Sequence, residues 1–177
     1  SFGRGVTISC WGWGAEWARP GMAQAMDELQ GLGADWITFH PYAWIKNNGA
    51  VRHRNSAADN TVLSPLKEAK KRGLKVMLKP HIGYWGSRFD WRGSISFETE
   101  ADWQRFFNDY EDFIVTQAKM AQAGAVALFS VGVEYKATLK RERDWRRIIA
   151  AVRKVYKGKL TYAANWDSYQ RVPFWDA

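Results

Sequence analysis

Five short apolar segments with a two-residue period constrain this chain most strongly, because stretches of helical periodicity separate them. A two-residue period is typical of β-strands, in which successive side chains point to opposite faces. The expected strands cover residues 5–10, 35–40, 74–81, 127–134 and 160–165, and the expected helices cover 20–32, 61–72, 100–123 and 141–156. This alternation predicts an α/β fold with a parallel sheet and right-handed crossovers.

The polar residues of these strands distinguish between two parallel architectures. Central strands of a doubly wound sheet are covered on both faces and read as nearly continuous apolar runs. Here one side of each strand carries Thr, Ser, Lys or Gly instead, as in Thr7, Ser9 and Lys79. The Trp-Gly-Trp-Gly run at 11–14 lacks the spacing of a phosphate-binding fingerprint. We therefore expect a parallel (β/α) barrel of the TIM type, with about five of its eight βα units in this chain.

Side chains capable of chemistry stand where the polar side of each strand ends. Residues 127–134 read Ala-Leu-Phe-Ser-Val-Gly-Val-Glu, which places Glu134 at the carboxyl-terminal end of its strand. Parallel α/β proteins carry out their chemistry at this edge. The other strands bring Trp11, His40, Lys79, His81 and Asn165 to it, and Asp167 lies just beyond. One polar residue at a strand end often only caps a loop, but five coincident strand ends favour a shared site.

Tryptophan is the distinctive component of the composition, with 11 residues in 177. Trp36, Trp103 and Trp145 fall within expected elements and are interpreted as core. Five others fall at or just after strand ends, namely Trp11, Trp13, Trp85, Trp91 and Trp166. Flat rings with one N–H donor suit the C–H faces of sugars, so these five are candidate sugar platforms. The alternative is that they only plug the barrel mouth.

The length of 177 residues and the hydrophobic content of 46% predict one domain over residues 1–177. No apolar run approaches the roughly 20 residues that span a bilayer, and no signal segment opens the chain. A start at Ser1 instead of Met is typical of processing or trimming, and an extracellular or periplasmic location is the expectation. The lone Cys10 excludes a disulfide within the chain.

The formal charge of +8 raises the question of nucleic-acid binding. Many of the Lys and Arg residues lie in the segments 67–75 and 141–159, on the polar faces of two expected helices. A solvated helix surface explains them, and no nucleic-acid motif accompanies them. We expect no nucleic-acid partner.

Seven segments in order along the chain resemble the (β/α)₈ glycoside hydrolases of clan A, and within them glycoside hydrolase family 113, whose characterised members are β-mannanases. The segments are Arg-Gly-Val-Thr-Ile-Ser at 4–9, Phe-His-Pro-Tyr-Ala at 39–43, Leu-Lys-Pro-His-Ile at 78–82, Tyr-Trp-Gly at 84–86, Trp-Arg-Gly at 91–93, Val-Gly-Val-Glu at 131–134 and Tyr-Ala-Ala-Asn-Trp-Asp at 162–167. The combination of these segments is fairly specific for the family, whereas no single segment would be.

The resemblance implies a retaining glycosidase that acts on β-linked polysaccharide, with β-1,4-mannan the expected substrate. Glu134 matches the general acid/base on strand four, and the nucleophile is expected on strand seven, beyond residue 177. Sugar hydroxyls would be held by His40, Tyr42, Lys79, His81 and Asn165, and Asp167 is assigned to binding. Trp11, Trp13, Trp85, Trp91 and Trp166 would provide the ring platforms. The expected partner is an oligo- or polysaccharide, and no cofactor or metal is expected.

Two features depart from the pattern of the clan. Many members carry an Asn before the acid/base Glu, where it holds the sugar 2-hydroxyl, but this chain has Val133. A complete barrel needs about 250 residues, so five units leave strands six to eight unaccounted for. We expect the chain alone to be inactive.

Two alternative functions remain open at this stage. Two histidines and a carboxylate are a common open metal site, and His40, His81 and Glu134 end three successive strands, so a metal-dependent hydrolase is one alternative. The second alternative is a non-catalytic carbohydrate-binding barrel or fragment, because no second catalytic carboxylate is apparent. The sequence gives no oligomeric state.

Overall fold

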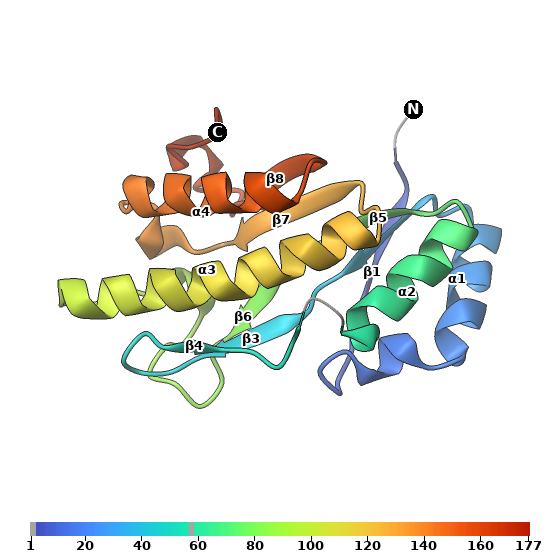
Figure 1. Ribbon diagram of the computed structural model, residues 1–177, viewed down its shortest axis with the longest axis horizontal. Coiled ribbons are helices and arrows are strands. Elements are labelled where there is room, and N and C mark those ends of the chain that lie inside the picture. Colours follow the sequence, from blue (N-terminus) through green and yellow to red (C-terminus); the bar gives the residue numbers. More distant parts are fainter. Residues whose placement is uncertain (1–2, 57–58) are drawn as a thin grey trace.

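A parallel sheet forms the centre of the molecule. The computed structural model describes residues 3–56 and 59–177, and within them five strands pair in the order β1-β2-β5-β7-β8 (Figure 1). The strands are β1 (Gly5–Ile8), β2 (Trp36–Phe39), β5 (Lys75–Leu78), β7 (Leu128–Val133) and β8 (Lys159–Ala163), all parallel to their neighbours. Their order in the sheet is their order in the chain. A doubly wound sheet reverses direction at a switch point, so this order fits the arc of a barrel.

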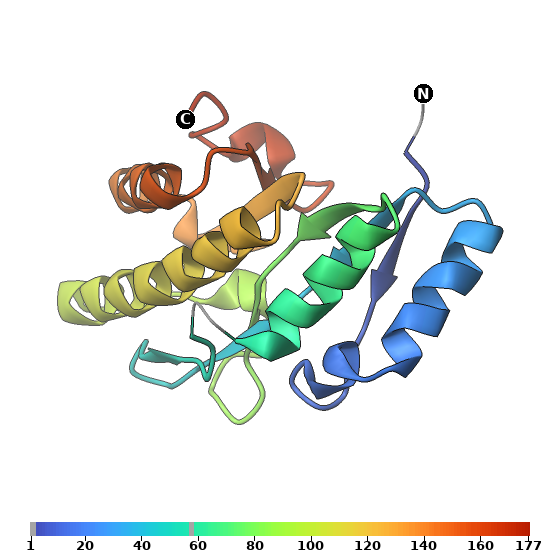
Figure 2. The same ribbon diagram turned by 45° about the vertical axis from the view of Figure 1, so that its right-hand side comes forward.

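The long helices alternate with these strands and cover one face of the sheet (Figures 1 and 2). They are α1 (Gly21–Gly31), α2 (Asn60–Lys71), α3 (Glu100–Ala123) and α4 (Glu142–Val155). Two of them begin at side-chain caps, because Asp59 accepts a hydrogen bond from the Thr61 amide and Thr99 accepts one from the Asp102 amide. Helices on a single face are the outer layer of a (β/α) barrel, so the predicted fold class is confirmed.

Proline lies just beyond the ends of β2 and β5, and a further strand begins directly after each proline. The expected strand 35–40 ends at Phe39, and the chain resumes after Pro41 as β3 (Tyr42–Ile45). The expected strand 74–81 ends at Leu78 and resumes after Pro80 as β6 (His81–Gly83). Proline has no amide hydrogen to donate to a strand ladder. Both interruptions fall at the same level, since Phe39 pairs with Leu78 and Tyr42 pairs with His81.

The resumed strands form a second small sheet, β4-β3-β6. Its third strand, β4 (Val51–Arg52), folds back antiparallel onto β3. The turn closes with a hydrogen bond from the Lys46 amide to the Ala50 carbonyl, and Gly49 has a φ of 84°. The segment between β2 and α2, for which the sequence predicts no strand, therefore contains two.

The core lies between the sheet and the four long helices. Its central ring is Trp145, which is fully buried and packs against Tyr110, Tyr135 and Tyr162. Trp103 is also buried, as expected. Trp36 is only partly buried, unlike the core position expected for it, and the Lys75 ammonium group lies 5.6 Å from its ring centroid.

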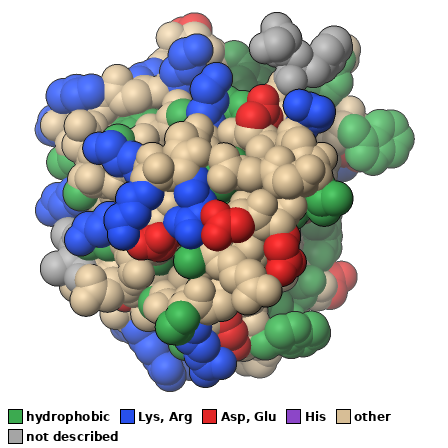
Figure 3. Space-filling model, turned by 90° about the vertical axis from the view of Figure 1, so that its right-hand side faces the viewer, with side chains coloured by type: hydrophobic (Ala, Val, Ile, Leu, Met, Phe, Trp, Pro, Cys, Tyr) green, Lys and Arg blue, Asp and Glu red, His purple; other side chains and the backbone are tan. Residues whose placement is uncertain are grey.

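The basic residues lie largely on the helical surface, where many of them form ion pairs. Arg72 binds Asp27 and Glu68 with nitrogen–oxygen distances of 2.7 and 2.8 Å. Arg141 likewise binds Glu100 and Asp144, at 2.6 and 2.7 Å. Figure 3, which looks onto the α1 and α2 end, shows Lys and Arg side chains gathered on one side and hydrophobic side chains along the other. In the described parts of the chain, no helix has the length and apolarity needed to cross a membrane.

Candidate active site

Glu134 leaves the end of β7 in an unusual backbone conformation. Its φ is 57°, in the left-handed region that non-glycine residues seldom adopt. The surrounding hydrogen bonds fix this turn: the Glu134 amide donates to the Ala163 carbonyl at 2.8 Å, and the Glu134 carbonyl accepts from the Lys136 amide at 2.9 Å. Such strain costs about 1–3 kcal/mol and persists where the surroundings hold it, commonly at functional sites. The carboxyl group is consequently presented at the carboxyl-terminal edge of the sheet.

The next residue anchors this turn in the core. Tyr135 is fully buried, and its amide donates a 2.8 Å hydrogen bond to the hydroxyl of Tyr162 on β8. Its ring stacks on Trp145, with centroids 6.0 Å apart and planes 13° from parallel. Gly132 permits this packing, since an added Cβ would lie 2.8 Å from the Trp145 ring. Side chains from β7, β8 and α4 therefore fix the position of the carboxylate.

Arg92 is the neighbour of Glu134 that sequence reasoning did not select. It opens the short helix η2 (Arg92–Ser94), and its Nη1 lies 3.8 Å from Glu134 Oε2. The Arg92 side chain is 17% exposed and that of Glu134 is 40% exposed. The Arg92 Nε is buried and has no hydrogen-bond partner among the residues described. The sequence feature that could have identified Arg92 is its place in a Trp-Arg-Gly segment of a long loop rich in glycine and aromatic residues.

The two histidines predicted for the site come together. The rings of His40 and His81 stack with centroids 5.1 Å apart. Tyr42 packs edge-on against both rings, and its hydroxyl lies 3.4 Å from His81 Nδ1. On the opposite side, His40 Nε2 lies 3.3 Å from the Ser9 hydroxyl at the end of β1. The aligned proline interruptions of β2 and β5 place these residues side by side.

Burial keeps both imidazoles neutral. Burial, together with the positive charges of Arg92 and Lys79 and the neighbouring His40, lowers the pKa of His81 to about 2. Burial also lowers the pKa of His40, and Lys79 and Arg92 add to the effect. The pKa of the Tyr42 phenol is raised by burial, which the charge of Arg92 opposes. A neutral imidazole offers one donor and one acceptor, so the cluster suits polar recognition.

A cleft of about 450 Å³ opens beside the histidines. It is lined by Ser9, Cys10, Trp11, Trp13, Gly14, Trp17, His40, Pro41, Tyr42 and Trp85. Three of its tryptophans face solvent, with Trp11 99%, Trp13 49% and Trp85 60% exposed. Trp13 has a left-handed φ of 56°, and its ring packs edge-on against Trp44 with centroids 5.6 Å apart. Five of the predicted binding residues therefore line one cleft, namely Trp11, Trp13, His40, Tyr42 and Trp85.

The other predicted residues lie outside this lining. Asp167 forms an ion pair with Lys136 at 3.0 Å, and Trp166 beside it is 89% exposed. Asn165 accepts hydrogen bonds through its carbonyl from the Ser168 and Tyr169 amides. Lys79, Trp91 and Glu134 also stand apart from the cleft lining, although Lys79 and Arg92, the neighbour of Trp91, act electrostatically on the histidines. The predicted residues thus divide between a β1–β2 side and a β7–β8 side.

The alternative metal site is not assembled. Within residues 3–56 and 59–177, no three His, Cys, Asp or Glu side chains are placed to hold one metal ion. His40 and His81 are close, but Glu134 does not join them, because its partner is Arg92. The ligand set His40, His81 and Glu134 expected for that alternative is therefore corrected.

The fold agrees with comparisons to known proteins. The structure resembles the GH113 β-mannanase AaManA from Alicyclobacillus acidocaldarius in complex with ManMIm, with a TM-score of 0.88 and 28% identity over 99% of this chain and 58% of that one. It also resembles a GH113 β-1,4-mannanase with a TM-score of 0.83 and 26% identity, over 99% of this chain and 59% of that one. The complex structure of a GH113 β-1,4-mannanase is similar to it as well, with a TM-score of 0.79 and 27% identity over 98% of this chain and 58% of that one.

The chain thus spans less than two thirds of the length of these structures, in line with a partial barrel. A comparison with curated proteins gives no match. The family model for Glycoside Hydrolase Family 113 matches residues 6–177, nearly the whole chain. The chain therefore belongs to glycoside hydrolase family 113.

Proposed function

We propose that the protein carrying this chain is a retaining glycosidase that cleaves β-1,4-linked mannan, with Glu134 as its general acid/base. The observation that carries the proposal is the placement of Glu134, held by its left-handed turn at the carboxyl edge of the fourth strand in a family 113 chain. The choice of mannan rests on the similar structures, which are described as β-mannanases.

Retaining hydrolysis needs two carboxyl groups about 5–5.5 Å apart. In the first step Glu134 donates its proton to the glycosidic oxygen while the other carboxylate attacks the anomeric carbon, forming a glycosyl-enzyme ester. In the second step Glu134 takes a proton from water, which attacks the anomeric carbon and releases the carboxylate. The nucleophile is expected on a seventh strand, so these five strands would supply the acid/base half of the pair.

Arg92 and the histidine cluster support the two halves of the proposed chemistry. Arg92, at 3.8 Å, is proposed to orient the Glu134 carboxyl group. The neutral rings of His40 and His81, with the Tyr42 hydroxyl, are proposed to bind sugar hydroxyls next to the reacting bond. Trp11, Trp13 and Trp85 would pack against the C–H faces of further sugar units along the cleft. Trp91, Trp166, Lys79, Asn165 and Asp167 remain proposed contacts on the rim.

The test of this proposal is Glu134→Gln in the protein that carries the complete barrel. An amide cannot donate the proton, so we expect activity on mannan to fall about 10²- to 10⁴-fold. The matched control is Glu28→Gln on the surface of α1, where the side chain accepts a hydrogen bond only from Gln24 among the described residues. Circular dichroism would establish that both variants fold.

An aryl glycoside with a good leaving group separates acid catalysis from general damage. Its glycosylation step needs less protonation, so Glu134→Gln should reduce that step less than it reduces mannan cleavage. Equal loss on the two substrates, or no loss on either, would contradict the assignment. The 177 residues alone are proposed to bind mannooligosaccharides weakly without hydrolysing them, because the second carboxylate is expected on another strand.

A further inference from the structure

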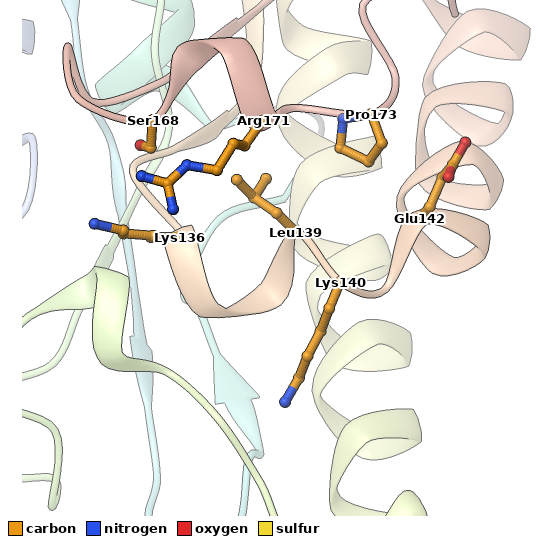
Figure 4. Close-up of a pocket in the computed structure, with 7 residues that line it drawn as sticks. All are labelled: Lys136, Leu139, Lys140, Glu142, Ser168, Arg171 and Pro173. Atoms are coloured by element: carbon orange, nitrogen blue, oxygen red, sulfur yellow. The ribbon is translucent and has the colours of Figure 1, made fainter.

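A second hollow, distinct from the aromatic cleft, lies over the ends of β7 and β8. Its volume is about 380 Å³, and it is lined by Lys136, Leu139, Lys140, Glu142, Ser168, Arg171 and Pro173 (Figure 4). The residues come from the segments around η3 (Lys136–Thr138) and η4 (Tyr169–Arg171), which follow β7 and β8. Three cations and one carboxylate contribute to the lining. The hollow is therefore a candidate site for an anionic group.

The charged side chains that line the hollow differ in their direction and in their partners. Figure 4 shows the side-chain ends of Lys136 and Arg171 on the same side of the hollow as Ser168, whereas those of Lys140 and Glu142 point away from them. Lys140 lies over the Trp103 ring at 5.2 Å, and Glu142 is bound by Arg146 at 2.8 Å. The carboxylate of the lining is thus neutralised elsewhere, which leaves Lys136 and Arg171 as the cations of the hollow nearest to Ser168.

Arg171 has unused donors. Its one hydrogen bond within residues 3–56 and 59–177 runs from Nη2 to the Asp167 carbonyl at 3.3 Å, and no carboxylate in those residues pairs with it. Lys136 is paired with the Asp167 carboxylate at 3.0 Å, which offsets its charge. A guanidinium group binds a carboxylate through two parallel hydrogen bonds. Arg171 can therefore be the main contact for an incoming anion, with Lys136 beside it.

The other lining residues indicate which kind of molecule bears the anionic group. Leu139 and Ser168 are buried, and Pro173 adds a further apolar surface next to them. A small inorganic ion would use only the cations. A sugar ring bearing a carboxylate would place its C–H face on the apolar floor and its charge at Arg171. The chemistry of the hollow fits a uronic acid.

The hollow lies next to the proposed acid/base. The Lys136 amide is bonded to the Glu134 carbonyl at 2.9 Å, so the two sites share one short segment. The aromatic cleft lies over β1 and β2 and the hollow lies over β7 and β8, so Glu134, at the end of β7, is on the side of the hollow. A saccharide bound at Glu134 would therefore extend toward the hollow.

We infer that the hollow formed by Lys136, Ser168 and Arg171 is a binding site for the carboxylate of a uronic acid residue in the saccharide. The inference rests on the proposed function and deepens it, because it makes the preferred substrate an acidic, uronate-bearing mannan. The site has no reacting bond of its own. It selects and positions a saccharide whose cleavage takes place at Glu134.

The test uses the 177-residue chain and four probes followed by NMR titration: methyl β-D-glucuronide, methyl β-D-glucoside, inorganic phosphate and mannotetraose. The glucuronide should bind more tightly than the glucoside or phosphate. Loss of a charge-assisted bidentate contact in Arg171→Gln should weaken glucuronide binding about tenfold. The matched control is Arg153→Gln, because that exposed guanidinium also makes its one hydrogen bond in the described residues to a backbone carbonyl, that of Gly158.

Each outcome decides between the two proposals. Equal binding of glucuronide and glucoside, phosphate binding as tight as glucuronide binding, or an Arg171→Gln variant with unchanged affinity would overturn the uronate site. Mannotetraose tests the aromatic cleft instead, and its binding should weaken in Trp85→Ala but not in Arg171→Gln. Failure of mannotetraose to bind, with Arg171-dependent glucuronide binding intact, contradicts the proposed mannan specificity and supports the site in the hollow.

Discussion

The two ends of the sheet edge differ in how firmly the side chains are held. On the β7–β8 side, Tyr135, Trp145 and Tyr162 are buried together, and they fix the turn that carries Glu134. On the β1–β2 side, Trp11 and Trp85 are largely exposed, and β1 itself is mostly exposed. An acid group must be positioned to within a fraction of an ångström. A ring platform contributes mainly through apolar area, so it tolerates a looser support.

The largest expected difference between the two ends is in stability. Trp145→Ala should lower the free energy of unfolding by about 3–5 kcal/mol, because it leaves a large cavity next to Tyr135. Trp11→Ala, at a side chain 99% exposed, should change it by no more than about 0.5 kcal/mol. Urea denaturation of both variants measures these changes in the free energy of unfolding. Similar decreases in the free energy of unfolding in the two variants would show that the two ends of the sheet edge are held equally firmly.

Acidification should lower the free energy of unfolding through the two buried histidines, His40 and His81. The folded-state pKa of His81 is about 2, against an ordinary value of 6.5, so the unfolded chain binds a proton that the folded chain does not. The free energy of unfolding should therefore fall as pH falls below about 6.5, by roughly 3 kcal/mol near pH 4 from His81 alone. Burial lowers the pKa of His40 as well, which acts in the same direction.

The matching measurement is urea denaturation at several pH values. His81→Gln should be less stable at neutral pH, but its stability should decline less steeply on acidification. Trp11→Ala should keep the slope of the parent chain, because it removes no titrating group. A slope unchanged by His81→Gln would show that the imidazole is protonated in the folded state.

The smallest expected effect concerns a single hydrogen bond under Glu134. Tyr162→Phe removes the hydroxyl that accepts the Tyr135 amide, leaving a buried donor unpaired at a cost of about 1–3 kcal/mol. In the complete enzyme we expect kcat to fall with little change in KM, since the acid is displaced and the aromatic cleft is not. Tyr169→Phe is the control, because that hydroxyl is on the exposed side of η4. A change in KM alone would place the effect in binding.

The parts of the fold that depend on local patterns were predictable from the sequence. The helix expected over residues 100–123 is observed as α3 with the same bounds, because its apolar stripe is continuous and Thr99 caps it. Glu134 was found because the two-residue period of its strand ends at a carboxylate. The arc of a TIM barrel followed from the alternation of elements, and the sheet order confirms it.

The parts that depend on long-range geometry were not predictable. The two-residue period continues through Pro41 and Pro80, so the pattern gives no sign that each strand is interrupted there. The approach of Arg92 to Glu134 joins residues more than 40 positions apart, which periodicity does not report. The left-handed turn at Glu134 is likewise set by Tyr135 and its partners, and nothing in the local sequence demands it.

The aligned interruptions of β2 and β5 have a consequence for redesign. Beyond them, β3, β4 and β6 form a separate sheet, which continues from the main one through the hydrogen bonds from the Lys79 amide to the Phe39 carbonyl and from the His81 amide to the Pro41 carbonyl. The hairpin turn between Lys46 and Ala50 is held from outside this sheet, because Arg88 donates to the Asn47 carbonyl and Arg105 of α3 donates to the Asn48 carbonyl. Lengthening the turn should therefore disturb its contacts with α3, while the register that stacks His40 on His81 stays as it is.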